Sequence, residues 1–169
     1  MDETQPTFQD PNSPDNQRHS DLTWWRRLAR RFFQPISASV TIVDPDVVLA
    51  VAYQQDLGSA YRVNVALSAA AALPMLRAEQ PDVLVCELNY SDMDGFTFLR
   101  TAKSLPGMAR TSVLVLSTRN GMGDKVSAFK LGVDDYLVKP VTVAQLREHL
   151  EALVRFRQTL IDRARGSAE

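Results

Sequence analysis

Short apolar runs alternate with stretches of helical periodicity from residue 39 to the end of the chain. Five runs are rich in β-branched and other apolar residues and are predicted strands: residues 39–43, 62–67, 82–88, 111–117 and 135–138. Helices are predicted between them, at about 46–56, 69–79, 95–104 and 122–131, with a longer one after Thr142. This alternation is typical of a parallel sheet with helices on both faces. The sequence therefore predicts an α/β fold with a doubly wound, five-stranded parallel sheet.

Three residues mark local helix features. Thr142 and Gln145 have the T-x-x-Q spacing of a capping box, which predicts that the last helix begins there. Gly132 stands where a helix terminator is expected. Pro74 falls inside the second predicted helix, where proline costs about 3 kcal/mol unless the helix starts late or kinks.

The first 38 residues differ from the rest in composition. Residues 1–20 hold four acids, one arginine and three prolines, and are expected to be disordered. Residues 21–38 are predicted to form a basic amphipathic helix followed by a linker. Its apolar and arginine side chains alternate at helical spacing: Trp24, Trp25, Arg26, Arg27, Leu28, Arg30, Arg31 and Phe32.

Charge and cysteine content exclude several classes of protein. The net charge of −1 supplies no overall field for nucleic acid. The single cysteine, Cys86, excludes a disulfide framework and a cysteine-rich zinc site. No apolar run reaches the roughly 18 residues of a membrane span, and the N-terminus does not read as a signal peptide. We expect a cytoplasmic protein.

Polar residues end four of the five predicted strands. Because the carboxyl ends of parallel strands meet at one edge of the sheet, these side chains should converge on a single site. Five polar residues in an otherwise apolar core need a functional reason. The candidate site residues are Asp44, Asp46, Glu87, Ser117 and Lys139.

Three segments resemble the receiver domain of the response-regulator family, the phosphorylated half of two-component signalling systems. They are AFKLGVDDYLVKP at 128–140, MDGF at 93–96 and PDVLVCEL at 81–88. The resemblance covers residues 39 to about 157 and implies the CheY-like, flavodoxin-like strand order 2-1-3-4-5. It also implies a signalling protein rather than an enzyme. Residues 158–169 would then be an extension of the last helix and a tail.

The resemblance assigns roles to the residues that match its motifs. Asp44 matches the first of two acids that hold Mg²⁺, Ser117 the hydroxyl that senses the phosphoryl group, and Lys139 the lysine that pairs with it. Tyr136 matches the switching aromatic. These roles suit phosphoryl transfer, which needs a nucleophile, a hard cation and positive charge on the transferred group.

Two positions depart from the family pattern. Glu87 stands where the acceptor aspartate is expected, and its carboxylate extends about 1.5 Å further from the backbone. Pro45 replaces the second acid, although Asp46 could turn in to substitute for it. We therefore predict a stand-alone pseudo-receiver that takes no phosphoryl group, metal or cofactor. The alternative is a working Mg²⁺-dependent phosphoreceiver that uses Glu87, Asp44 and Asp46.

The remaining alternatives concern Glu87 and the partners. Glu87 is either a remnant of a lost active site or a mimic of the phosphorylated state.

The expected partner is another signalling protein, bound through the surface of helix 122–131, strand 135–138 and the last helix. That helix keeps its apolar spacing to Gly166, so it either frays or contacts a second copy or residues 21–33. Residues 21–33 could dock on the domain or lie on a membrane. Binding of nucleic acid comes third, since the sequence contains no known nucleic-acid-binding motif.

Overall fold

The computed structural model describes residues 38–166, which form a five-stranded parallel sheet and its helices. The strands are β1 (Ser39–Val43), β2 (Arg62–Ala66), β3 (Val83–Cys86), β4 (Ser112–Ser117) and β5 (Asp135–Val138). The helices are α2 (Val47–Leu57), α3 (Ala69–Glu79), α4 (Gly95–Ser104), α5 (Met122–Lys130) and α6 (Val143–Gly166), with a 3-10 turn at Met108–Arg110. The strand order β2-β1-β3-β4-β5 confirms the predicted topology.

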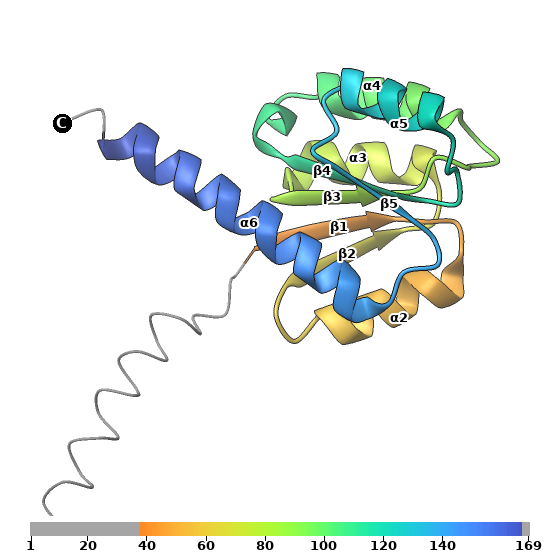
Figure 1. Cartoon of the computed structure of the whole chain (residues 1–169), viewed down its shortest axis with the longest axis horizontal. Coiled ribbons are helices and arrows are strands. Elements are labelled where there is room, and N and C mark those ends of the chain that lie inside the picture. Colours follow the sequence, from red (N-terminus) through yellow and green to blue (C-terminus); the bar gives the residue numbers. More distant parts are fainter. Residues whose placement is uncertain (1–37, 167–169) are drawn as a thin grey trace, which may run out of the picture. The chain divides into compact units, whose positions relative to one another are not determined.

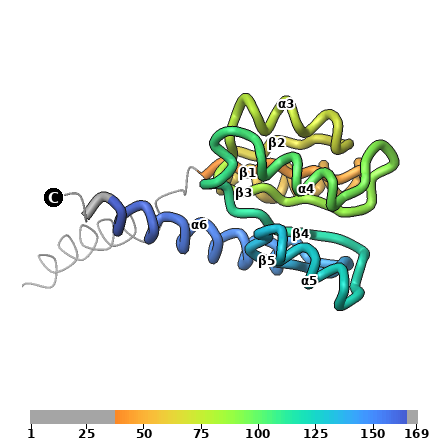
Figure 2. The backbone as a smooth tube through the Cα atoms, turned by 90° about the horizontal axis from the view of Figure 1, so that it is seen from above, coloured from red at the N-terminus to blue at the C-terminus, as the bar shows by residue number. Residues whose placement is uncertain are grey.

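Helices cover both faces of the sheet. Figure 1 shows α3 and α4 on one side of the strands and α2 with α6 on the other. The tube view places α5 beside β5, at one margin of the sheet (Figure 2). Because both faces are covered, the central strand β3 is apolar throughout, and all four of its residues are buried.

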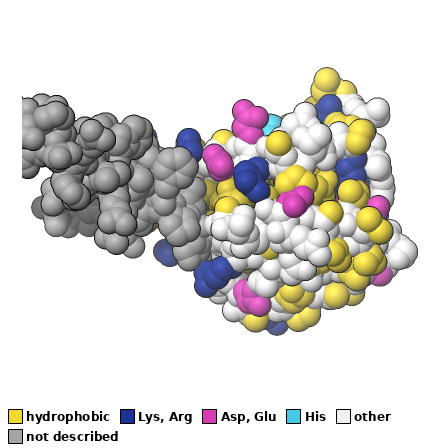
Figure 3. Space-filling model, turned by 90° about the horizontal axis from the view of Figure 1, so that it is seen from below, with side chains coloured by type: hydrophobic (Ala, Val, Ile, Leu, Met, Phe, Trp, Pro, Cys, Tyr) yellow, Lys and Arg dark blue, Asp and Glu magenta, His cyan; other side chains and the backbone are white. Residues whose placement is uncertain are grey.

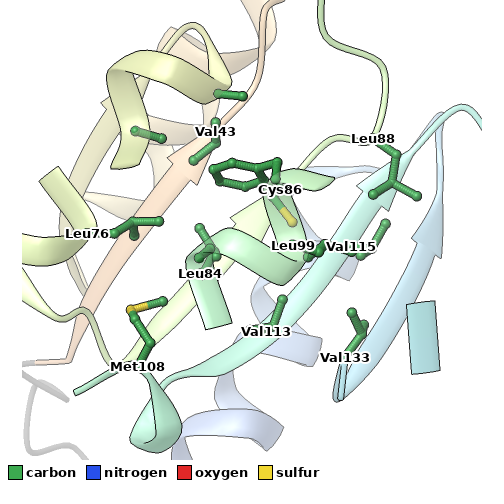
Figure 4. Close-up of a cluster of buried hydrophobic side chains, with 14 of the residues drawn as sticks. Val43, Leu76, Leu84, Cys86, Leu88, Leu99, Met108, Val113, Val115 and Val133 are labelled. Carbon is green, nitrogen blue, oxygen red and sulfur yellow. The ribbon is translucent and has the colours of Figure 1, made fainter. Parts of the chain in front are cut away.

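A cluster of buried hydrophobic side chains lies between the sheet and the layer that contains α3 and α4. It includes Leu84 and Cys86 of β3, Val113 of β4 and Leu76 of α3, which are labelled in the close-up of Figure 4. Full burial of a side chain such as Leu84 stabilises the fold by roughly 1.5–3 kcal/mol. This core holds the central strands rigidly, and with them the residues at the strand ends.

The local helix signals are found where the sequence predicts them. Thr142 and Gln145 form the capping box, with the Thr142 N–H 3.0 Å from Gln145 Oε1 and the Gln145 N–H 3.2 Å from Thr142 Oγ1. Gly132 follows Leu131, the C-cap of α5, and has φ +80°, a conformation that favours glycine. Pro74 does not delay α3, which begins at Ala69 and passes through the proline. The alanine-rich first turn, with its high helix propensity, offsets part of the proline penalty.

The last helix continues past the sheet, as Figures 1 and 2 show. Its helical spacing holds to Gly166, as the periodicity predicts. In the described part of the chain, no helix is both long and apolar enough to cross a membrane. The predicted disordered leader (1–20) and amphipathic helix (21–33) lie outside the described residues.

Bulky apolar side chains are exposed on three helices. Seen from the side on which α2 lies, hydrophobic side chains are scattered among polar and charged ones (Figure 3). The most exposed are Val48 of α2, Met122 of α5 and Phe156 of α6, at 79%, 75% and 62%. The surface therefore offers apolar contact sites on more than one side of the sheet.

Candidate functional site

Four of the five predicted site residues meet at the carboxyl edge of the sheet. Asp44 follows β1, Glu87 follows β3, Ser117 ends β4 and Lys139 follows β5. Asp44, Glu87 and Ser117 are buried, and the side chain of Lys139 is 10% exposed. The fold therefore places two carboxylates, a hydroxyl and an ammonium group in one largely dry cluster, which we call the strand-end cluster.

Lys139 lies between the two carboxylates. Its Nζ is 2.6 Å from Asp44 Oδ2 and 3.0 Å from Glu87 Oε2. Burial alone would lower the pKa of Lys139, but the hydrogen bonds and charges of Asp44 and Glu87 outweigh it and raise that pKa. Lys139 is therefore charged and holds the two acids together.

Both oxygens of Glu87 are engaged. Oε1 accepts the Leu88 N–H at 2.7 Å, the Asn89 N–H at 3.2 Å and the Ser117 hydroxyl, while Oε2 faces Lys139. Burial favours the neutral acid, but the hydrogen bonds from Ser117, Leu88 and Lys139 favour the carboxylate, and together they lower the pKa of Glu87. Glu87 is thus a buried anion with both of its oxygens in contact with donors.

The strand-end cluster connects to Tyr136 through the loop after β4. Ser117 Oγ accepts the Arg119 N–H at 3.1 Å, and the Tyr136 hydroxyl donates to the Arg119 carbonyl at 2.8 Å. The Tyr136 ring is half-buried against the core, with Lys125 Nζ 6.0 Å from its centroid. Tyr136 is therefore adjacent to the cluster, and its hydroxyl also interacts with the side chain of Ser117.

Asp46 does not join the cluster. It is exposed, and its Oδ1 accepts the N–H groups of Val48 and Leu49 at 3.0 and 3.1 Å, so it is the N-cap of α2. Its own N–H donates to Asp44 Oδ1 at 2.9 Å, which orients Asp44. Asp46 thus contributes its backbone N–H to the site, whereas its carboxylate caps α2.

The residues present do not fit a magnesium site. Mg²⁺ requires oxygen ligands free to complete an octahedron. Asp44 and Glu87 are both paired with Lys139, Asp46 caps a helix, and Pro45 has no side-chain oxygen. Within residues 38–166, no group of three or more acidic, histidine or cysteine side chains has metal-binding geometry.

Two residues beside the cluster were not among the candidates from sequence. Asn89 Oδ1 accepts from Arg119 Nε at 2.7 Å, and Asn89 Nδ2 donates to Thr118 Oγ1 at 2.9 Å. Each follows a predicted site residue by two positions: Asn89 follows Glu87, and Arg119 follows Ser117. Extending the strand-end rule by two residues would have found both.

A further glycine fixes the loop that follows Glu87. A Cβ on Gly95 would lie 2.3 Å from the Leu88 carbonyl oxygen, so only glycine fits there. Asp94 then caps α4 through the Thr97 N–H at 2.9 Å. This explains the glycine of the MDGF motif.

The segment from Trp24 to Phe32 lies outside the described residues, so its place relative to the cluster stays a prediction.

The fold and the cluster define a class of protein: a doubly wound α/β domain with acids and a lysine at the carboxyl edge of its sheet. The chain belongs to the response regulator receiver domain family, whose model matches residues 40–151. This confirms the resemblance read from the sequence. The family is one of signalling domains that interact with other signalling proteins.

Relatives and solved structures agree with this assignment. The transcriptional regulatory protein PrrA of Mycobacterium tuberculosis is 32% identical over 122 residues, which are 72% of this chain and 52% of that protein. The chain therefore spans about half the length of such curated relatives. The response regulator PleD of Caulobacter vibrioides is 30% identical over 97 residues, 57% of this chain and 21% of that protein.

Among solved structures, chemotaxis protein CheY4 of Vibrio cholerae is 26% identical, with a TM-score of 0.65 over 69% of this chain and 98% of that one. A CheY-like receiver domain protein of Methanospirillum hungatei has a TM-score of 0.68 over 72% of this chain and 97% of that one. At 22% identity, it supports the fold alone.

Proposed function

We propose that this chain is a pseudo-receiver that signals by protein contact without being phosphorylated. One observation carries the proposal: the carboxylate of Glu87 already binds the Ser117 hydroxyl and the Lys139 ammonium. By the family resemblance, these two groups would contact the phosphoryl oxygens in an active receiver. Glu87 thus supplies, in the unmodified chain, negative charge to the groups that a phosphoryl group would otherwise contact.

The contacts of Glu87 also argue against its action as a nucleophile. Oε1 accepts three hydrogen bonds and Oε2 faces Lys139 at 3.0 Å, so attack on phosphorus would require several of these contacts to break. A nucleophile must also be held in line with the leaving group to within fractions of an ångström. No cation is expected to help, because the acids around Glu87 do not fit Mg²⁺.

The proposed output surface consists of α5, β5 and α6. Met122, Val126 and Phe129 recur at helical spacing on α5 and are 75%, 44% and 49% exposed. Exposed apolar side chains on one helix face favour a protein partner. Tyr136 of β5 connects this surface to the strand-end cluster through the Arg119 carbonyl.

Phosphoryl transfer can be tested directly. The full chain is incubated with acetyl phosphate and Mg²⁺, and its intact mass is measured. We expect no adduct. The matched control is the double variant Pro45→Asp/Glu87→Asp, which supplies both acids of the family pattern and is expected to gain one phosphoryl group. A phosphoryl adduct on Glu87 of the unchanged protein would overturn the proposal.

The partner surface can be tested with two exposed apolar positions. Proteins captured from native cell extract by the full chain are quantified for wild type, Phe129→Ser and Val48→Ser. We expect Phe129→Ser to lose the captured partner, because Phe129 lies on α5. Val48→Ser on α2 is the matched control and should retain it. Equal loss in both variants would contradict the α5 surface.

A further inference from the structure

Arg119 lies where the strand-end cluster meets the elements of the proposed output surface. Its backbone N–H donates to Ser117 Oγ at 3.1 Å, and its carbonyl accepts the Tyr136 hydroxyl at 2.8 Å. Its side chain donates from Nε to Asn89 Oδ1 at 2.7 Å. One residue after β4 thus contacts the cluster, β5 and the loop after β3.

These contacts close a ring of hydrogen bonds. Glu87 Oε1 accepts from the Ser117 hydroxyl and from the Asn89 N–H. Ser117 Oγ accepts from Arg119, and Arg119 Nε donates to Asn89. The ring begins and ends at one carboxylate oxygen, so a change at Glu87 reaches Arg119 from two directions. In a closed network of this kind, each bond depends on the position of the others.

Outside the ring, the Arg119 guanidinium reaches two helices. Its Nη1 is 3.6 Å from Asp124 Oδ1, in the first turn of α5. Its Cζ lies 5.6 Å from the centroid of the Phe96 ring on α4, a cation–π distance. Asp124 belongs to the helix that carries Met122, Val126 and Phe129. Arg119 therefore touches both the cluster and the helix of the proposed output surface.

We infer that Arg119 is the positioning residue through which the charge at Glu87 sets the start of α5. The inference rests on the proposed function and names how the cluster regulates its partner surface. Arginine suits the role because its planar, forked side chain can bond Asn89 through Nε while Nη1 faces Asp124. Lysine has its donors on one atom at the end of a flexible stem, so it lacks the fork that lets Nε and Nη1 face these two groups at once.

The test is a double-mutant cycle on the full chain. Amide hydrogen exchange of Met122–Lys130 is measured for wild type, Glu87→Gln, Arg119→Ala and the double variant. Exchange protection reports local opening of α5. We expect Glu87→Gln to reduce this protection about threefold or more in wild type and to have no further effect once Arg119 is removed. If Arg119 had only a structural role, Arg119→Ala would lower the protection of α5 by the same factor whether residue 87 is Glu or Gln.

Two further variants sharpen the cycle. Arg110→Ala removes the same charge from an exposed arginine outside the ring and should leave the effect of Glu87→Gln intact. Arg119→Lys keeps a positive charge near Asp124 but should lose the coupling. Equal effects of Glu87→Gln with and without Arg119, or no effect of Glu87→Gln on α5, would overturn the inference. Either result is separable from the proposed function, which is tested by phosphoryl uptake at Glu87 and by partner capture rather than by amide exchange.

Discussion

At the scale of single residues, the strand-end cluster is a buried arrangement of two acids and one base. Lys139 compensates Asp44 and Glu87, and each carboxylate has further hydrogen-bond donors. Buried charges are tolerated only when they are paired and hydrogen-bonded in this way. Stability should therefore respond much more strongly to the loss of one partner than to the loss of a surface charge.

Replacement of Lys139 by methionine should be strongly destabilising. Lys139→Met leaves Asp44 and Glu87 buried side by side without a cation, and breaking a buried pair costs about 3–5 kcal/mol. Urea unfolding at neutral pH measures this free energy. Lys130→Met, at an exposed position of α5, is the charge-matched control and should change stability by no more than about 0.5 kcal/mol. Equal stability of the two variants would contradict the buried pairing.

The acid limb of the stability curve should depend on Glu87. Its pKa is lowered in the folded state, so the unfolded chain binds the proton more readily. Its contribution is present above the ordinary glutamate pKa of about 4.3 and is lost as pH falls through the folded value. Urea unfolding across this range should show a smaller acid loss for Glu87→Gln than for wild type.

The stability of Glu87→Gln should still fall with decreasing pH, and the structure shows one acid that contributes to this fall. Asp82 is another acid whose pKa is lowered: burial opposes the shift, but hydrogen bonds from Ser39 and the charge of Arg157 outweigh it. It should contribute equally to both proteins. The free energy of unfolding of wild type and Glu87→Gln could instead fall in parallel as the pH is lowered. That result would show that the folded environment does not favour the Glu87 carboxylate.

At this scale, the sequence predicts which residues converge but not what each atom contacts. Asp44, Glu87, Ser117 and Lys139 meet because each ends a parallel strand. Asp46 has the same residue type and nearly the same position as Asp44, yet its side chain turns to the helix N-terminus. That choice depends on local backbone angles and competing donors, which periodicity and spacing do not encode.

At the scale of elements, the sheet register explains where the predicted strands were too long. The runs 62–67 and 82–88 end as strands at Ala66 and Cys86, and both residues pair with Val43, the last residue of β1. Apolar character continues beyond these points, since Leu88 is buried. Strand order and type were predictable from the sequence and its resemblance, whereas strand ends depend on the neighbouring strand.

The start of α2 gives a prediction at the element scale. Asp46→Ala removes the acceptor for the Val48 and Leu49 N–H groups and should cost about 1 kcal/mol, the usual value of an N-cap. Asp46→Asn keeps an acceptor oxygen and should cost much less. Thermal or urea unfolding measures both. If the two variants were equally destabilised, the charge of Asp46 rather than its capping bond would matter.

At the scale of the whole molecule, α6 has two parts with different partners. Leu146, Leu150 and Val154 are buried, and Arg157 Nη1 pairs with Asp82 at the amino end of β3. The following turns are more exposed, with Leu160 at 49%. The first part is needed for the fold, whereas the second presents apolar surface.

Truncation after Gln158 should therefore leave the domain folded. It removes residues that contribute little buried surface, so the free energy of unfolding should change by only about 0.5 kcal/mol, as for surface changes. Arg157→Ala is the contrasting variant. It leaves Asp82 without its cation and should destabilise the domain more than the truncation does. A truncation as costly as Arg157→Ala would place the end of the folded domain beyond residue 158.

The same truncation tests one of the three alternatives for the exposed turns of α6, contact with a second copy, against fraying and contact with residues 21–33. Sedimentation velocity of the full and truncated chains is compared over a range of concentrations. If Leu160 and the turns around it pack against a second copy, the full chain sediments as a dimer and the truncated chain shifts to a monomer. If the turns fray, or contact residues 21–33 of the same chain, both chains sediment as monomers. Because the truncation is expected to leave stability nearly unchanged, a shift would report a lost contact between copies rather than unfolding.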